Sequence, residues 1–124
     1  MNFPNDLLYS ESHEWVREYD GVARVGLTDY AQRELGDIVF VALPDVGEDA
    51  VRGERIADVE SVKAVSEVIS PLSGTIKEVN RAAADEPEII NSDPYGAWLF
   101  EIGNISDREG LLSPDDYEKY IGSL

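Results

Sequence analysis

The sequence predicts a mostly β protein, a sandwich or a barrel built from short strands. Its apolar runs are short and are separated by turn signals, of which Asp20-Gly21 and Ser70-Pro71-Leu72-Ser73-Gly74 are the clearest. Asp20-Gly21 predicts a tight hairpin between residues 13–19 and 22–27. Apolar residues make up 43% of the 124-residue chain, so we expect one domain over residues 1–124 with a real core.

A short helix and a further strand follow the first hairpin. Thr28 is a suitable N-cap for a helix over residues 29–35, and Gly36 would close its C-terminal end. The continuous apolar run 38–43 predicts a buried strand. Residues 45–53 are rich in glycine and acids and are expected to form a loop.

A second hairpin is predicted in a central block of residues 54–80. Its two arms flank Ser61-Val62-Lys63, so Lys63 is expected near the hairpin tip. The Pro- and Gly-containing turn that begins at Ser70 then leads into an alternating strand over residues 75–79.

The last third of the chain is expected to be irregular before it ends in a strand and a helix. Residues 87–90 are compatible with one helical turn, and residues 97–102 predict the last strand. Ser113 as N-cap and Pro114 at the first helical position predict a helix over residues 113–122. Its apolar side would consist of Tyr117, Tyr120 and Ile121.

The charge balance limits the choice of partners. The net charge is −16 and the sequence pI is near 4.1, so nucleic acids and anionic membrane surfaces would be repelled. Partners with basic docking sites are favoured instead. No apolar run is long enough for a membrane span, and the N-terminus lacks the pattern of a signal peptide, so we expect a cytoplasmic protein.

Motifs that would indicate catalysis by the polypeptide are missing. The chain has no cysteine, P-loop, dinucleotide fingerprint, HExxH or GxSxG motif. A single histidine, His13, is expected to have a structural or surface role, because one isolated histidine is a poor metal site or catalytic base. We therefore expect no catalytic residue, no metal site and no enzymatic activity.

Lys63 is the most distinctive chemical feature. A lysine at a tight hairpin tip presents a reachable amine at a defined place, which is what a modifying enzyme requires. Asp58, Glu60 and Glu67 surround it, and it is the only cation between Asp58 and Glu67. Taken alone, such a lysine is more often an ordinary exposed residue of a hairpin.

Several short segments, in the same order, resemble those of the glycine cleavage H-protein family. Glu60-Ser61-Val62-Lys63-Ala64 followed by the turn at Ser70 is similar to the family's lipoylation segment. The other matching segments are Ser12–Trp15, Gly26–Gln32, Leu35–Val39, Leu43-Pro44, Glu78–Asn80 and Ile90–Gly96. One departure is the compact Gly96-Ala97-Trp98, where the family pattern usually has an additional residue.

The resemblance implies a fold and a prosthetic group. The fold would be a flattened β-barrel of two sheets, a barrel-sandwich hybrid of the biotinyl/lipoyl-carrier type, with short helices and a C-terminal helix. Lipoate would be attached to Lys63, with Glu60, Ser61, Val62 and Ala64 flanking it for the attaching enzyme. Biotin carriers share the fold class but place their lysine between methionines, so Val62 and Ala64 favour lipoate.

The function implied by the resemblance is carriage of a one-carbon unit. The carrier would take the aminomethyl group of glycine from the P protein, a glycine decarboxylase, to the T protein, an aminomethyltransferase. Dihydrolipoyl dehydrogenase, the L protein, would reoxidise the lipoyl arm. A lipoate ligase or a lipoyl/octanoyl transferase would attach it, and the carrier is expected to be a monomer.

The resemblance also implies a place where the loaded arm docks. Residues matching Ser12, Glu14 and Glu67 would contact a cationic aminomethyl group through a hydroxyl and two carboxylates. From the residues alone, Glu14 and Glu67 are better explained as two of the 26 acids, with ordinary solvated side chains. Two other functions stay open: an H-like lipoyl carrier of another pathway, such as sulfur oxidation or lipoate relay, and an unmodified acidic interaction domain.

Overall fold

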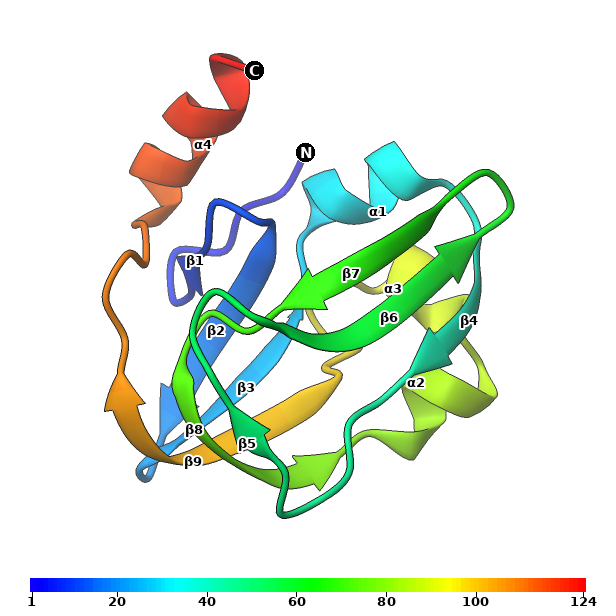
Figure 1. The fold of residues 1–124 in the computed structure, drawn as a ribbon. Coiled ribbons are helices and arrows are strands. Elements are labelled where there is room, and N and C mark those ends of the chain that lie inside the picture. Colours follow the sequence, from blue (N-terminus) through cyan, green and yellow to red (C-terminus); the bar gives the residue numbers. More distant parts are fainter.

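Two antiparallel sheets and four short helices make up the fold in the computed structural model, which describes all 124 residues (Figure 1). The larger sheet has the order β1-β2-β3-β9-β8-β5, and the smaller has the order β4-β6-β7. The strands are β1 (Leu8–Tyr9), β2 (Glu14–Tyr19), β3 (Val22–Leu27), β4 (Ile38–Ala42), β5 (Asp49–Ala50), β6 (Arg55–Ser61), β7 (Val65–Ile69), β8 (Ser73–Val79) and β9 (Phe100–Asp107). The helices are α1 (Asp29–Leu35), α2 (Arg81–Asp85), α3 (Ile89–Ser92) and α4 (Pro114–Gly122).

The first hairpin is confirmed. β2 pairs with β3 in register from Glu14↔Leu27 to Tyr19↔Val22. Asp20 and Gly21 make the turn with φ values of 49° and 79°, the left-handed geometry that two-residue hairpins require and that aspartate and glycine tolerate. This local signal therefore determines which β2 and β3 residues pair.

Helix α1 begins and ends where its capping residues predict. The Thr28 Oγ1 accepts a hydrogen bond from the Ala31 amide at 3.1 Å, so the hydroxyl satisfies one of the free amides of the first turn. Gly36 follows with a φ of 77°, a backbone conformation that ends the helix and favours glycine. Helix α1 lies beside the β6–β7 hairpin (Figure 1).

Strand β4 differs from the buried strand expected over residues 38–43. Its register with β6 shifts between Ile38 and Phe40, the sign of a β-bulge. Ile38 and Val41 point into the core, whereas Val39 and Phe40 are 55% and 49% exposed. The bulge breaks the two-residue alternation, so an unbroken apolar run leaves two large side chains on the surface.

The last strand is the clearest error of sequence-based prediction. We expected it over residues 97–102, but β9 begins only at Phe100 and continues to Asp107. Before it, the chain turns at Gly96, and the Trp98 carbonyl accepts a hydrogen bond from the Asn80 side chain at 2.7 Å. Trp98 is thereby engaged by a side chain instead of a neighbouring strand.

Several short elements were not expected from the sequence. Strands β1 and β5 have two residues each, too few to show a periodic pattern. Helix α2 begins after Asn80, whose Oδ1 caps the Ala82 amide, and the helical turn expected at residues 87–90 lies slightly later, in α3. The central block matches the prediction, because β6, β7 and β8 all lie within residues 54–80.

The core has two parts. The larger part fills the space between the two sheets and includes Val25, Val59 and Ile102. The smaller part lies under the C-terminal helix, where the Tyr117 ring stacks on the Tyr9 ring at 4.8 Å between centroids. The predicted apolar side of α4 is confirmed, since Tyr120 and Ile121 pack against the same cluster. No helix is long and apolar enough to span a membrane.

Candidate functional site at the tip of the Lys63 hairpin

Lys63 lies at the tip of the β6–β7 hairpin, as the sequence predicted. The Ser61 amide donates a hydrogen bond to the Ala64 carbonyl at 2.8 Å, which closes the turn. The Ser61 hydroxyl accepts from the amides of Lys63 at 3.3 Å and Ala64 at 3.1 Å. A serine at this position therefore satisfies the free amides of a sharp turn and keeps its shape defined.

The hairpin tip is also held against the body of the molecule. The Val62 amide donates a hydrogen bond to the Asp37 carbonyl at 3.0 Å, and Ser61 pairs with Ile38. The Lys63 stem runs past Gly36, since a Cβ built on Gly36 would lie 3.6 Å from the Lys63 Cε. The lysine thus starts from a fixed point beside the C-terminal end of α1.

The side-chain amine of Lys63 is free. Lys63 is exposed, and its amine takes part in no hydrogen bond or ion pair. Of the three surrounding acids, Glu60 and Glu67 are exposed, but Asp58 is paired with Arg55. Of these three acids, only Glu60 and Glu67 therefore lack a cationic partner.

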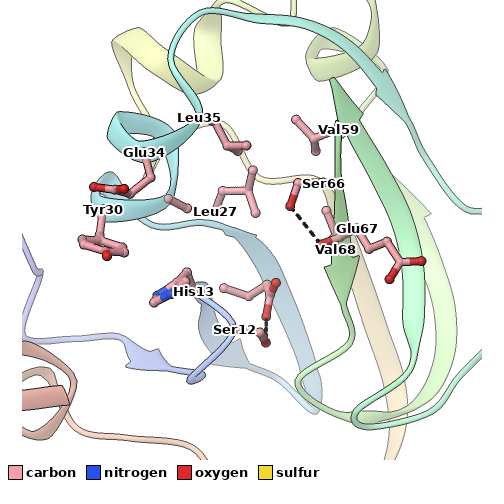
Figure 2. Close-up of a pocket in the computed structure, with 12 residues that line it drawn as sticks. Ser12, His13, Leu27, Tyr30, Glu34, Leu35, Val59, Ser66, Glu67 and Val68 are labelled. Atoms are coloured by element: carbon pink, nitrogen blue, oxygen red, sulfur yellow. Dashed lines mark hydrogen bonds between the residues drawn. The ribbon is translucent and has the colours of Figure 1, made fainter. Parts of the chain in front are cut away.

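A cleft of about 150 Å³ lies between α1 and the β6–β7 hairpin (Figure 2). Its wall has an apolar part, formed by Leu27, Ala31 and Leu35 on one side and Val59 and Val68 on the other. The other residues that line the cleft are polar or carry a polar group: Ser12, His13, Glu14, Tyr30, Glu34, Ser66 and Glu67. Lysine and arginine are missing from the lining, so the cleft suits an apolar chain that ends in a cation.

Glu14 is the buried acid of this cleft. It is only 1% exposed, and its Oε1 accepts hydrogen bonds from the hydroxyls of Ser10 at 2.7 Å and Ser12 at 2.5 Å. Its Oε2 accepts from the Ile69 amide at 3.3 Å. Glu14 is therefore not one of the solvated surface acids.

Burial raises the pKa of Glu14 to about 7, although hydrogen bonds from Ser12, Ser10 and the Ile69 amide favour its charged form. A carboxyl group with a pKa in this range exists in both protonation states near neutral pH. An ammonium group placed beside it would favour the carboxylate and form a charge-assisted hydrogen bond. The site is thus suited to bind a cation.

Glu67 lies differently from Glu14. In Figure 2 its carboxylate points away from the cleft, whereas the Ser66 side chain points toward it. The register explains this, because Ser66 pairs with the buried Val59 and Glu67 pairs with Asp58 on the opposite face. The structure therefore brings Ser12 and Glu14 together, and Glu67 would have to change rotamer to join them.

Sequence reasoning missed two hydroxyl groups in and behind the cleft. Ser66 could have been found by counting in steps of two from the apolar Val68. Ser10 precedes the strand and has no such signal. The single histidine has the structural role expected, since the His13 Nδ1 hydrogen-bonds the buried Tyr117 hydroxyl at 2.9 Å at the edge of the cleft.

Comparison with known proteins matches this chain to one family. Residues 7–123 match the family model described as Glycine cleavage H-protein. A glycine cleavage system H protein from Herpetosiphon aurantiacus is 54% identical over 121 residues, covering 97% of this chain and 94% of the relative. One from Lachnoclostridium phytofermentans is 50% identical over 122 residues, covering 98% and 96%.

A solved structure of the same family is also similar to this chain. The crystal structure of a glycine cleavage system H protein from Mycobacterium marinum superposes with a TM-score of 0.91 at 44% sequence identity, and the match covers 96% of this chain and 98% of that one. The sequence and the fold agree over almost the full length of both chains. The protein described here therefore belongs to the glycine cleavage H-protein family.

Proposed function

We propose that this chain is the lipoyl carrier of a glycine cleavage system, with the lipoyl group joined to the Lys63 Nζ through an amide bond. One observation carries the proposal: Lys63 lies on a fixed hairpin tip beside a cleft with an apolar wall and a buried acid, Glu14. Such a geometry suits a lysine that is modified with a long apolar arm and then folds back.

The residues present fit a lipoyl group. The Lys63 amine is exposed and unpaired, so an attaching enzyme, either a lipoate ligase or a lipoyl/octanoyl transferase, has access to it. Leu27, Ala31 and Leu35 offer an apolar wall to a hydrocarbon chain. Acylation would remove the one cation at the tip and leave Glu60 and Glu67 to attract basic surfaces of partner enzymes.

When bound, the lipoyl group supplies a dithiol/disulfide pair that carries the aminomethyl group of glycine from the P protein to the T protein and is reoxidised by dihydrolipoyl dehydrogenase. The chain itself acts as a carrier and not as a catalyst: it displays, orients and shelters the arm. Its own sequence contains no cysteine. We assign the display to the Ser61-capped tip and the shelter to the cleft.

Within the cleft, Glu14 would accept a hydrogen bond from the protonated amine of the cargo. The hydroxyls of Ser10 and Ser12 already donate to its Oε1, so its Oε2 is the oxygen with more capacity left. The apolar wall limits the access of water, which strengthens the ionic contact. Because its hydroxyl donates to the Glu14 Oε1, Ser12 would act by orienting the Glu14 carboxylate.

The attachment site is tested by replacing single lysines. We expect Lys63→Arg to abolish lipoylation, whereas Lys77→Arg on β8 and Lys119→Arg on α4 retain it, because only Lys63 is displayed on a hairpin tip. The measurement is intact mass with peptide mapping after incubation with lipoate ligase, ATP and lipoate. A lipoyl group on Lys63→Arg would refute the assignment, and a lipoylated wild type that accepts nothing from the P protein would indicate another pathway.

The docking role is tested by the loss of cargo from the loaded carrier without T protein. Removing a charge-assisted hydrogen bond costs about 1.5–3 kcal/mol, so Glu14→Gln should hasten spontaneous loss of the aminomethyl group by about tenfold or more. Glu67→Gln is the matched control and should leave the rate unchanged, because its carboxylate points away from the cleft. If only Glu67→Gln hastens the loss, the docking assignment moves from Glu14 to Glu67.

A further inference from the structure

The segment between α1 and β4 supports the Lys63 tip. Some backbone amides and carbonyls of this segment have no hydrogen-bond partner in a helix or a strand. Helix α1 ends at Leu35, so Gly36 and Ile38 lie where helical hydrogen bonding has stopped and strand pairing has barely begun. Backbone groups at such a break need other partners. The hairpin tip depends on this segment, because the Val62 amide donates to the Asp37 carbonyl at 3.0 Å.

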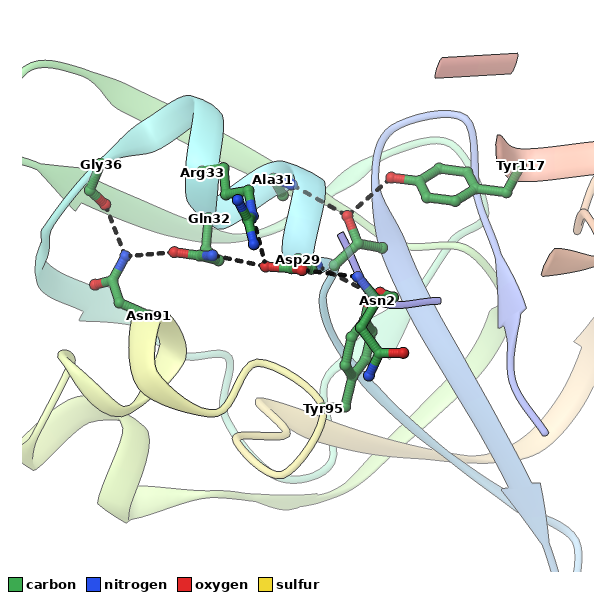
Figure 3. Close-up of polar contacts among 10 residues, drawn as sticks. Asn2, Asp29, Ala31, Gln32, Arg33, Gly36, Asn91, Tyr95 and Tyr117 are labelled. Carbon is green, nitrogen blue, oxygen red and sulfur yellow. Dashed lines mark hydrogen bonds and ion pairs between the residues drawn. The ribbon is translucent and has the colours of Figure 1, made fainter. Parts of the chain in front are cut away.

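Asn91, on α3, supplies those partners, and Figure 3 shows its bond to Gly36. Its Nδ2 donates to the Gly36 carbonyl at 2.9 Å, and its Oδ1 accepts from the Ile38 amide at 2.9 Å. One side chain thus bonds to the backbone on both sides of Asp37.

The same Nδ2 group also reaches α1. It donates to the Gln32 Oε1 at 3.0 Å, and the Gln32 Nε2 donates to the Asp29 carboxylate at 2.8 Å (Figure 3). Asp29 in turn accepts from the Asn2 amide at 3.0 Å. Asn91 is therefore connected through side chains along the whole of α1, the helix that forms one wall of the cleft.

We propose that Asn91 is a positioning residue for Lys63: it holds residues 36–38 in place, and these hold the hairpin tip at the mouth of the cleft. This inference rests on the proposed lipoyl function and extends it to a residue that touches neither the arm nor the cleft. Asn91 belongs to the Ile90–Gly96 segment, to which the carrier function alone gives no role. Without the Asn91 side chain, Asp37 would move, and the starting point of the arm would move with it.

The first test uses the unmodified protein, so it does not depend on lipoylation. Hydrogen exchange of the Val62 amide, followed by NMR, should be about tenfold faster in Asn91→Ala, because the carbonyl that protects this amide loses its support. Asn80→Ala is the matched control: Asn80 also bridges two backbone groups, Ala82 and Trp98, but at a distance from the tip along the chain. Equal Val62 exchange in the two variants would overturn the proposal.

The second test uses the lipoylated protein loaded with cargo. Asn91→Ala should lose the aminomethyl group several times faster than Asn80→Ala at matched unfolding free energy, since only the first variant displaces the arm. Faster Val62 exchange without faster cargo loss would refute a role in positioning. If the wild type itself gives no protection of cargo, the proposed docking fails, and the exchange result alone then decides whether Asn91 supports the tip.

Asn91→Asp is closer in shape to the wild type than Asn91→Ala is, so it tests the hydrogen bonds with less disturbance of the fold. Asn91→Asp keeps an oxygen for the Ile38 amide but loses both donors, those to Gly36 and Gln32. It should show faster Val62 exchange in the same direction as Asn91→Ala. Wild-type exchange in a folded Asn91→Asp would show that the donor bonds are not needed, and the proposal would then be wrong.

Discussion

Glu14 is an acidic side chain in a position normally occupied by apolar residues. Its neighbour Trp15 is fully buried on the opposite face of β2, and Glu14 itself is 1% exposed. A buried carboxyl without partners would be costly, but two serine hydroxyls and one backbone amide satisfy it. A buried carboxyl at this position is explained if a cation binds beside it.

Replacing Glu14 should change how the free energy of unfolding depends on pH. Burial raises its pKa in the folded protein to about 7, above the ordinary value of 4.5, so its contribution to stability is complete below about pH 4.5 and is lost as the pH rises through about 7. Over this pH range the free energy of unfolding of the wild type should therefore fall by up to about 3 kcal/mol. Glu14→Gln should not show this fall.

Urea unfolding of both proteins between about pH 4.5 and about pH 8 measures this difference. The comparison with Glu14→Gln is needed because other acids, such as Glu101 beside Arg24, have a lowered pKa and act in the opposite direction. Parallel stability curves for the two proteins would show that Glu14 titrates like a solvated acid.

At the scale of single residues, the sequence was informative where a motif or a turn imposed a role. Lys63 was predicted from its place between two strands, and Thr28 and Gly36 from helix capping. The burial of Glu14 could not be predicted, because it depends on Ser10 and on Ile69, a residue 55 positions away along the chain. Asn91 could not be predicted either, since all its partners lie far away in sequence.

At the scale of elements, local signals predicted the hairpins and the capped helices but not the irregular strands. The turn at Asp20-Gly21 needs only its own two residues, and α4 needs only Ser113 and Pro114 at its start. The bulge in β4 depends on its pairing with β6, and the late start of β9 depends on the hydrogen bond from the Asn80 side chain to the Trp98 carbonyl. Such tertiary effects leave little trace in an apolar run.

The bulge leads to a prediction about the stability of β4. Ile38 is 3% exposed and Phe40 is 49% exposed, although phenylalanine is the larger residue. Ile38→Ala should therefore lower the free energy of unfolding by about 2–4 kcal/mol. Phe40→Ala should lower it by about 1 kcal/mol or less. Equilibrium unfolding in urea checks the order, and a larger loss for Phe40→Ala would mean that β4 packs its other face inward.

At the scale of the whole molecule, acidic side chains far outnumber basic ones. All the ion pairs in the structure use arginines, and none uses a lysine. With a net charge of −16, most acids have no cationic partner and lie on the surface. Such a field attracts basic partner surfaces from a distance and weakens as salt is added.

The residues alone predicted the fold class correctly, but they did not predict the order of strands in the sheets. A mostly β sandwich follows from many short strands with turns between them. The pairing of β3 with β9, and the position of β5 beside β8, involve strands that are separated by other elements. Only the family resemblance anticipated two sheets folded into a flattened barrel.

The hydrogen bond from Val62 to Asp37 fixes the pivot of the proposed arm, and a fixed pivot changes the affinity that the cleft needs. A group on a short tether meets a nearby site at an effective concentration of about millimolar or more. A cleft with a Kd of about 1 mM for the free group would then be filled about half of the time. Weak binding is thus enough to shelter the cargo, and a partner enzyme can draw it out at little energetic cost.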